Sequence, residues 1–197
     1  MQGTHDWYET LMATYDKLNY ITSRADPCVR YKRDDGEYAV TDTYTDDIFG
    51  ASTTDEEVTR RKAEIGNEWE IKEVEENDYF LGMRVQQDLE NDTIRLTQRP
   101  YWEHVLNRFN LIHVPPRNIP LPVGLTLDSN MSLKTDSERR QMDDKPYRPI
   151  LGSIMWGQLT TRPDLSFAVF LLSRFQADPG ITHWNALMHV VGYVKNT

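Results

Sequence analysis

The stretch "TYTDDIFG", residues 43–50, places two adjacent aspartates between residues that favour β-strands. In a straight strand, neighbouring side chains point to opposite faces, so Asp46 and Asp47 would diverge. At the tip of a tight strand–turn–strand they converge, and the flanking "VTDTY" and "IFGAS" have the composition for such a hairpin. We therefore predict a β-hairpin with both carboxylates at its tip.

The paired carboxylates indicate a site for divalent cations. Two carboxylates held together repel, and the pKa of one rises unless a cation lies between them. Mg²⁺ prefers oxygen ligands and commonly binds one or two carboxylates together with substrate phosphates. Two such ions, about 3.5–4 Å apart, stabilise both oxygens that exchange in phosphoryl transfer. The pair thus indicates nucleotidyl transfer with Mg²⁺, or with Mn²⁺ in its place. The alternative is an ordinary turn dipeptide, as we expect for Asp34-Asp35.

The segments around this hairpin predict a sheet backed by helices. Residues 5–20 predict a helix, in which apolar side chains recur at helical spacing at Trp7, Leu11, Tyr15 and Leu18. Asp35-Gly36 supplies a turn between two strands. A helix follows "TTDEE", with Val58 and Ile65 as its apolar stripe and its charges on a solvated face. The segments "YFLGMRVQQD" and "DTIRLTQ" predict a second strand pair, joined by "LENDT".

Helices dominate the remainder of the chain. A helix is predicted to begin near Pro100, and the proline-rich residues 112–146 predict a linker or an extended arm on the surface, with no core residues in it. From Tyr147 onward the periodicity is helical, and small residues such as Gly152 and Gly157 allow close helix contacts. The predicted fold class is α+β: a palm-like antiparallel sheet backed by helices, followed by an all-helical unit. The predicted segments are 1–99, 100–146 and 147–197.

Composition excludes several classes of protein. The 197 residues contain one cysteine, Cys28, which excludes an intrachain disulfide and indicates a reducing compartment. No apolar run reaches the length of about 18–20 residues that spans a bilayer, and the start "MQGTHDWYET" lacks the features of a signal peptide. The net charge of −9 is uneven, with −11 in residues 1–99 and +3 in residues 145–197. Acidity argues mildly against nonspecific nucleic-acid binding, whereas the basic final segment is compatible with it.

A set of ordered blocks resembles the reverse transcriptase of Ty1/copia-type LTR retrotransposons. "TYTDDIFGAS" is followed, at family intervals and in family order, by "YFLGMRV", "IRLTQRPYWEHVLNRFNL", "YRPILGSIMW", "TRPDLSFAVFLLSRF" and "HWNALMHVVGYVKNT". The opening "QGTHDWYETLM" also fits the family. The resemblance covers almost the whole chain, so it is far more specific than the Y-x-D-D motif alone.

The resemblance implies a role for each matching residue. Asp46 and Asp47 match the metal-binding catalytic carboxylates of the palm, and Tyr44 and Thr45 complete the Y-x-D-D hairpin near the primer terminus. Leu81-Gly82 matches the later palm hairpin that contacts the primer. Residues 147–197 match the thumb and connection that grip the duplex. The candidate phosphate contacts are Lys145, Arg148, Arg162, Arg174 and Lys195, whose alternative role is ordinary solubility.

The chain also departs from the family pattern. The family's third carboxylate lies on a strand upstream of Y-x-D-D, and we expect both it and the nucleotide-gripping fingers to be missing here. Asp42 shares strand parity with Asp46, but four residues of strand place it about 13 Å away, too far to replace that ligand. The chain is expected to end before the ribonuclease H segment. The pattern therefore indicates part of a polyprotein with an incomplete active site.

The leading hypothesis is a partial RNA-directed DNA polymerase that is inactive as this isolated fragment. Its implied partners are an RNA or DNA template–primer, deoxynucleoside triphosphates and the remainder of the Pol polyprotein, with no membrane. Its implied location is the cytoplasm, inside a virus-like particle, with the nucleus as the alternative. The second hypothesis is a non-catalytic nucleic-acid-binding or interaction remnant. A third is a folded translation product without function.

Overall fold

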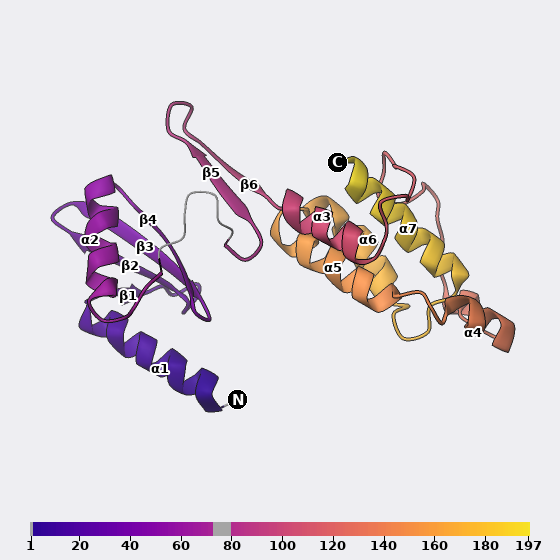
Figure 1. The fold of residues 1–197 in the computed structure, drawn as a ribbon, viewed down its shortest axis with the longest axis horizontal. Coiled ribbons are helices and arrows are strands. Elements are labelled where there is room, and N and C mark those ends of the chain that lie inside the picture. Colours follow the sequence, from indigo (N-terminus) through magenta and orange to yellow (C-terminus); the bar gives the residue numbers. More distant parts are fainter. Residues whose placement is uncertain (1, 73–79) are drawn as a thin grey trace. The chain divides into compact units, whose positions relative to one another are not determined.

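The computed structural model describes residues 2–72 and 80–197, which divide into two compact units, 1–80 and 81–197 (Figure 1). The first contains the sheet that bears the paired aspartates. The second contains a separate hairpin and the helices of the carboxyl-terminal half.

The first unit consists of two helices and an antiparallel sheet. Its elements are α1 (Gln2–Lys17), β1 (Ile21–Thr22), β2 (Val29–Asp34), β3 (Glu37–Tyr44), β4 (Asp47–Ser52) and α2 (Asp55–Gly66). The strand order is β1-β2-β3-β4, so β3 lies between β2 and β4. The predicted strand–turn–strand around Asp35-Gly36 is confirmed, because both residues take positive φ angles, 51° and 89°, that close the tight β2–β3 turn.

Helix α2 packs on the sheet partly through charged side chains. Our prediction of a solvated charged face is wrong for Glu57 and Arg61, which are buried, although most other charged residues of α2 are exposed. The buried residues of α2 are Glu57, Arg61 and Ile65, which recur every four residues on one face. The Arg61 guanidinium contacts Asp34 at the end of β2 (2.7 Å) and Glu64 (2.8 Å). These charges can be buried because Arg61 meets Asp34 of the sheet and Glu57 pairs with Arg60 and Arg61 of the same helix.

The apolar core of the first unit lies where α1 meets α2 and the sheet. It consists of Leu11, Tyr15, Tyr20 and Ile65. Tyr15 also bridges to the sheet through a contact of 3.3 Å between its hydroxyl and Thr43 Oγ1. The apolar spacing that predicted helix 5–20 is therefore the spacing that packs α1, although α1 begins and ends about three residues earlier than expected.

The second unit begins with a hairpin and continues as a helical bundle. The hairpin pairs β5 (Arg84–Asp88) with β6 (Thr93–Thr97). The helices are α3 (Arg99–Arg108), α4 (Asp136–Met142), α5 (Tyr147–Thr160), α6 (Ser166–Ser173) and α7 (Ile181–Asn196), with short 3₁₀ turns at Ser129–Met131 and Pro163–Leu165. The predicted second strand pair and the helical character of residues 147–197 are both confirmed.

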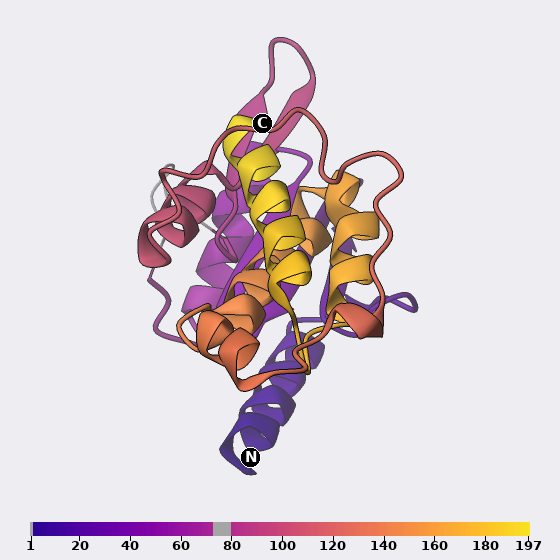
Figure 2. The same ribbon diagram turned by 90° about the vertical axis from the view of Figure 1, so that its right-hand side faces the viewer.

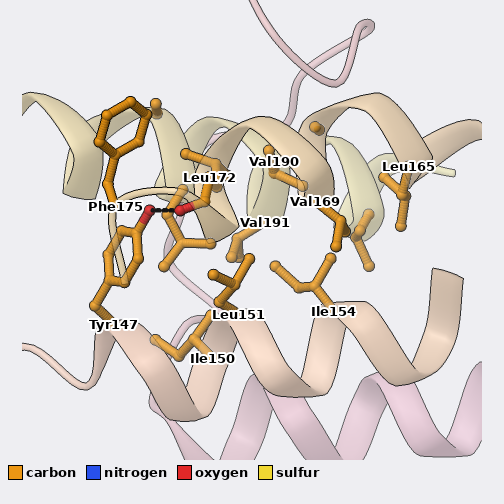
Figure 3. Packing of buried hydrophobic residues seen from close by; sticks show 14 of the residues in the cluster. Tyr147, Ile150, Leu151, Ile154, Leu165, Val169, Leu172, Phe175, Val190 and Val191 are labelled. Carbon is orange, nitrogen blue, oxygen red and sulfur yellow. Dashed lines mark hydrogen bonds between the residues drawn. The ribbon is translucent and has the colours of Figure 1, made fainter. Parts of the chain in front are cut away.

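The core of this unit is formed mainly by α5, α6 and α7 (Figure 3). Ile150, Leu165 and Leu187 are fully buried within it. The Tyr147 hydroxyl donates to the backbone carbonyl of Leu172 (3.0 Å), which ties the start of α5 to the end of α6. Gly157 allows the close approach that we expected, since a Cβ there would overlap the ring of Trp102 from α3.

The proline-rich segment 112–146 wraps around the helical unit (Figure 2), but the prediction that it holds no core is wrong. Val114 and Leu127 belong to the main core cluster, and Met142 of α4 is buried as well. The backbone N–H of Arg117 donates to the carbonyl of Gly192 (3.0 Å), so the segment is bonded directly to α7. Single apolar residues among prolines show no period, which is why the sequence pattern concealed them.

The α+β fold class is confirmed: an antiparallel sheet with helices, then a mostly helical carboxyl-terminal half. Along the chain, the boundary between the two compact units falls between residues 80 and 81. The β5–β6 hairpin therefore belongs to the same unit as helices α3 to α7. The assignment of 1–99, 100–146 and 147–197 to palm, arm and thumb stays a prediction. In the part of the chain that the structure describes, no helix is long and apolar enough to cross a membrane.

Candidate active site

The paired aspartates lie at the tip of the β3–β4 hairpin. Tyr44 of β3 pairs with Asp47 of β4, which leaves Thr45 and Asp46 as a two-residue loop. Thr45 takes a positive φ of 58°, a conformation that two-residue hairpin loops require and that glycine usually supplies. The sequence therefore folds locally as we predicted from "TYTDDIFG".

The register determines which side chains share a face of the sheet. Ala39, Thr41 and Thr43 are buried on the face that meets the helices. Because side chains alternate along a strand, Tyr44 and its pair partner Asp47 lie on the opposite face. The Tyr44 side chain is 52% exposed, and Asp46 and Asp47 are exposed too. The turn thus presents both carboxylates, with a tyrosine beside them, to solvent.

The chemistry of these donors fits a hard divalent cation. Within residues 2–72 and 80–197, no side chain forms an ion pair with Asp46 or Asp47, so no protein cation neutralises either charge there. Adjacent oxygen donors of this kind are the ligands that Mg²⁺ and Mn²⁺ accept. Among the described residues, the turn thus supplies two candidate ligands, Asp46 and Asp47.

A third carboxylate does not join the pair among the described residues. No group of three His, Cys, Asp or Glu side chains is placed there to hold a metal ion. Asp42 pairs with Phe49, which makes it a diagonal neighbour of Asp47 on the open face, about 7–8 Å away between Cα atoms. Asp42 thus lies on the same face as Asp47, yet it does not complete a three-ligand group among the described residues.

A contact from α1 reaches the same turn. The indole N–H of Trp7 donates to the backbone carbonyl of Thr45, with 2.8 Å between Nε1 and O. Our sequence reasoning assigned Trp7 only to the apolar face of a helix and so missed this bond. The signal available was the presence of Trp7 in the opening block "QGTHDWYETLM", which carries part of the family resemblance.

Leu81 and Gly82, the expected primer-contacting pair, form a turn just before β5. Both residues take positive φ angles, 53° and 76°. Their conformation is thus that of a tight turn, which suits the predicted hairpin context. They belong to the second unit, whereas the aspartates belong to the first.

The five candidate phosphate contacts differ in the hydrogen bonds and ion pairs that they form within the second unit. Arg162 pairs with Asp164 (2.8 Å), and Lys195 donates to the carbonyl of Val114 (3.0 Å). The Asp164 carboxylate accepts hydrogen bonds from the Arg162 guanidinium and raises the pKa of that guanidinium. Arg148 Nε donates to the carbonyl of Gln176 (2.5 Å). These three side chains therefore have structural partners.

The other two basic residues make looser contacts. Lys145 Nζ lies 3.3 Å from exposed Asp144 and 5.8 Å from the ring centre of Trp184. The Arg174 guanidinium lies 5.5 Å from the ring centre of Phe175. Contacts of this kind leave polar hydrogens available to a phosphate.

The buried charges under the sheet are the other polar feature that sequence reasoning missed. Burial disfavours the charged form of Arg61, but its bonds to Glu64, Asp34 and Glu57 outweigh that effect and raise its pKa. The bond from Arg61 in turn lowers the pKa of Asp34. The four-residue spacing of Glu57, Arg61 and Ile65 places them on one face of a helix, but spacing alone does not show that this face is buried.

Comparisons with known proteins agree with the resemblance drawn from the motifs. Residues 1–123 match the family described as reverse transcriptase (RNA-dependent DNA polymerase). The chain is 29% identical over its whole length to the retrovirus-related Pol polyprotein from transposon TNT 1-94 of Nicotiana tabacum, of which it covers 15%. It is 30% identical to that from transposon RE2 of Arabidopsis thaliana, again over all of this chain and 13% of the relative.

A shorter relative matches as well. A transposon Ty5-1 protein of Saccharomyces cerevisiae is 27% identical over 97% of this chain and 60% of its own length. The chain thus spans about a seventh of the two plant polyproteins and less than two thirds of the yeast protein. No solved structure matches the chain significantly.

Proposed function

This chain belongs to the reverse transcriptase (RNA-dependent DNA polymerase) family, as part of a copia-type Pol polyprotein, and from that premise we propose that it supplies the primer-side catalytic turn of an RNA-directed DNA polymerase. The reaction is transfer of a nucleotide to the 3′-hydroxyl of a primer. The observation that carries the proposal is the β3–β4 turn, which exposes Asp46 and Asp47 side by side without a protein cation among the described residues.

The residues of the turn have different roles in this proposal. Asp46 and Asp47 would hold Mg²⁺, or Mn²⁺ in its place, and reverse transcriptases generally use divalent metal. The bound ion supplies charge neutralisation at the reacting phosphate. Tyr44 and Thr45 lie beside the carboxylates and would contact the primer terminus and the incoming deoxynucleoside triphosphate. Leu81 and Gly82 would contact the primer strand from their own turn.

The partners proposed for the chain follow from its family. An RNA or DNA template–primer would lie along the helical unit, where residues 147–197 act as thumb and connection. Fingers, ribonuclease H and integrase would be supplied by other parts of a Pol polyprotein. The location would be a cytoplasmic virus-like particle, with the nucleus as the alternative.

We expect the 197 residues alone not to extend a primer, because the described residues bring no third carboxylate to Asp46 and Asp47. The decisive measurement on this chain is therefore metal binding. Mn²⁺ should broaden the amide NMR signals of residues 45–47 at lower concentrations than any others, and Asp46→Asn should remove that effect.

The matched control is Asp35→Asn. Asp35 also lies in a two-residue hairpin turn of the first unit, between β2 and β3, so the substitution removes the same charge from a comparable exposed turn. Asp35→Asn should leave the broadening at residues 45–47 unchanged. In a complete polymerase that includes this chain, Asp46→Asn should abolish primer extension while duplex binding persists. Extension that survived Asp46→Asn would overturn the assignment.

A second candidate function is a non-catalytic nucleic-acid-binding module. The observation that favours it is the incomplete carboxylate set among the described residues. This candidate predicts duplex affinity that falls steeply with salt, because phosphate contacts release counterions. It also predicts that affinity is the same with and without divalent metal. An affinity unchanged between low and high salt would exclude it.

A further inference from the structure

The catalytic turn contains a residue in an unfavourable backbone conformation. Thr45 has a φ of 58°, and a β-branched side chain at positive φ is a genuine outlier. Such residues persist only where the surrounding structure holds them in place. Thr45 therefore depends on contacts from outside its own turn.

The contact that meets this turn is the hydrogen bond from Trp7. Its indole N–H donates to the Thr45 carbonyl at 2.8 Å, across 38 residues of sequence. That carbonyl belongs to the peptide plane that joins Thr45 to Asp46. Because a peptide plane rotates as a unit, fixing its oxygen restrains ψ of Thr45 and φ of Asp46. The bond therefore restrains the direction in which Asp46 leaves the turn.

Trp7 is itself held by packing within the first unit. Its ring meets the ring of Trp69 edge to face, with 5.1 Å between centroids. Trp7, Leu11 and Tyr15 recur every four residues on α1, and the latter two are buried. The Tyr15 hydroxyl contacts Thr43 Oγ1 at 3.3 Å, two residues before Thr45. One face of α1 thus contacts β3 and its turn at two points.

We propose that Trp7 is a positioning residue for the catalytic turn: its indole N–H fixes the Thr45–Asp46 peptide and thereby the direction of the Asp46 carboxylate. The proposal rests on the proposed function, since it concerns how that turn presents its metal ligands. Trp7 does not touch substrate or metal; it acts through the backbone.

The competing explanation is that Trp7 serves only to fill the core beside Trp69. Trp69 provides the matched control, because its indole Nε1 is buried and has no hydrogen-bond partner within the part of the chain that the structure describes. Trp7→Phe and Trp69→Phe both remove one indole from the same aromatic pair. Only Trp7→Phe removes a hydrogen bond to the turn.

The first measurement uses the metal-free chain, with amide NMR signals and hydrogen exchange read residue by residue. Trp7→Phe should shift the signals of Thr45, Asp46 and Asp47 and speed their exchange by about two- to tenfold, the effect of losing one ordinary hydrogen bond. Trp69→Phe should leave these three amides unchanged. Amides of residues 29–34 should remain protected in both variants, which shows that the sheet is folded. Equal effects of the two substitutions on the turn would overturn the proposal.

The second measurement adds Mn²⁺ to the same proteins. Trp7→Phe should raise the Mn²⁺ concentration that broadens residues 45–47 by about tenfold, the usual effect of removing an outer partner of a metal ligand. Trp69→Phe should not change it. Mn²⁺ affinity in Trp7→Phe equal to that of the unmodified chain would overturn the positioning role.

The two measurements separate the failure of this proposal from the failure of the proposed function. If the unmodified chain shows no Mn²⁺ effect at residues 45–47, the metal assignment fails. The metal-free comparison then still decides whether Trp7 holds the turn. If Mn²⁺ binds there but Trp7→Phe behaves like Trp69→Phe, the metal assignment stands and the positioning role falls.

Discussion

Arg61 of α2 and Asp34 at the end of β2 form an ion pair of 2.7 Å, in which the Arg61 side chain is only 5% exposed. Glu57 lies one helical turn before Arg61 and is 2% exposed, so the pair belongs to a buried charged contact between helix and sheet. Buried charges of this kind are costly unless all of them are paired. The attachment of α2 to the sheet therefore depends on Arg61.

Arg61→Met should destabilise the first unit by about 3–5 kcal/mol, because it removes the buried guanidinium that pairs with Glu57, Asp34 and Glu64 together. The matched control is Arg60→Met. Arg60 also contacts Glu57, but its side chain is 46% exposed, so the loss should be at most about 1 kcal/mol. Hydrogen exchange of the β2 and β3 amides measures the effect within this unit. Equal protection in the two variants would show that the buried contact contributes little.

Gly157→Ala should destabilise the second unit by about 1–3 kcal/mol, the usual cost of an added methyl in a packed core. The added Cβ would overlap the ring of Trp102, and the rigid indole would have to move. Gly152 lies in the same helix, and a Cβ added there would meet no atom within 4 Å, so Gly152→Ala should instead stabilise by up to about 1 kcal/mol. Urea denaturation of both variants tests this opposition of signs.

His183 should make the stability of the second unit depend on pH. Burial lowers the pKa of this imidazole, and the smaller effects of Asp128 and Asp178 oppose that shift. The ring stacks on Phe175 at 4.2 Å, and its Nδ1 accepts from the backbone N–H of Gly180 at 2.9 Å. Because the folded-state pKa lies below the unfolded value of about 6.5, the unfolded chain takes up the proton first. Stability is therefore full above that value and falls as the pH falls through the folded-state pKa.

The measurement is the melting temperature between pH 7.5 and pH 5. His183→Gln should reduce the loss on acidification, although it also lowers stability at neutral pH. The comparison variant is His104→Gln, which removes an exposed imidazole of the same unit, and the quantity compared is the slope of melting temperature against pH. Some slope should remain in His183→Gln, because burial also lowers the pKa of His189. A slope that is identical in both variants would contradict this assignment.

Local pattern was sufficient to predict the tip of the β3–β4 hairpin, since Thr45 and Asp46 form the turn between two runs of β-formers. It was insufficient for Arg61, because a charge at helical spacing looks the same whether it faces water or faces Asp34. It was also insufficient for the bond from Trp7 to Thr45, which joins residues 38 positions apart. Val114 and Leu127 were missed because single apolar residues among prolines have no periodicity. Residues adjacent in the sequence were thus sufficient to predict the site, whereas the contacts that support it join residues far apart in the sequence.

The basic residues of the helical unit should separate into two groups when a template–primer duplex is bound. Arg162 and Lys195 are engaged with Asp164 and with the carbonyl of Val114, so Arg162→Gln and Lys195→Gln should lower stability more than affinity. Lys145 and Arg174 have looser contacts, so Lys145→Gln and Arg174→Gln should weaken duplex binding with little loss of stability. Each phosphate contact removed should reduce the slope of log affinity against log salt by about 0.9 on B-form DNA. If Lys195→Gln reduced the slope as much as Arg174→Gln did, its bond to the arm would be secondary to a phosphate contact.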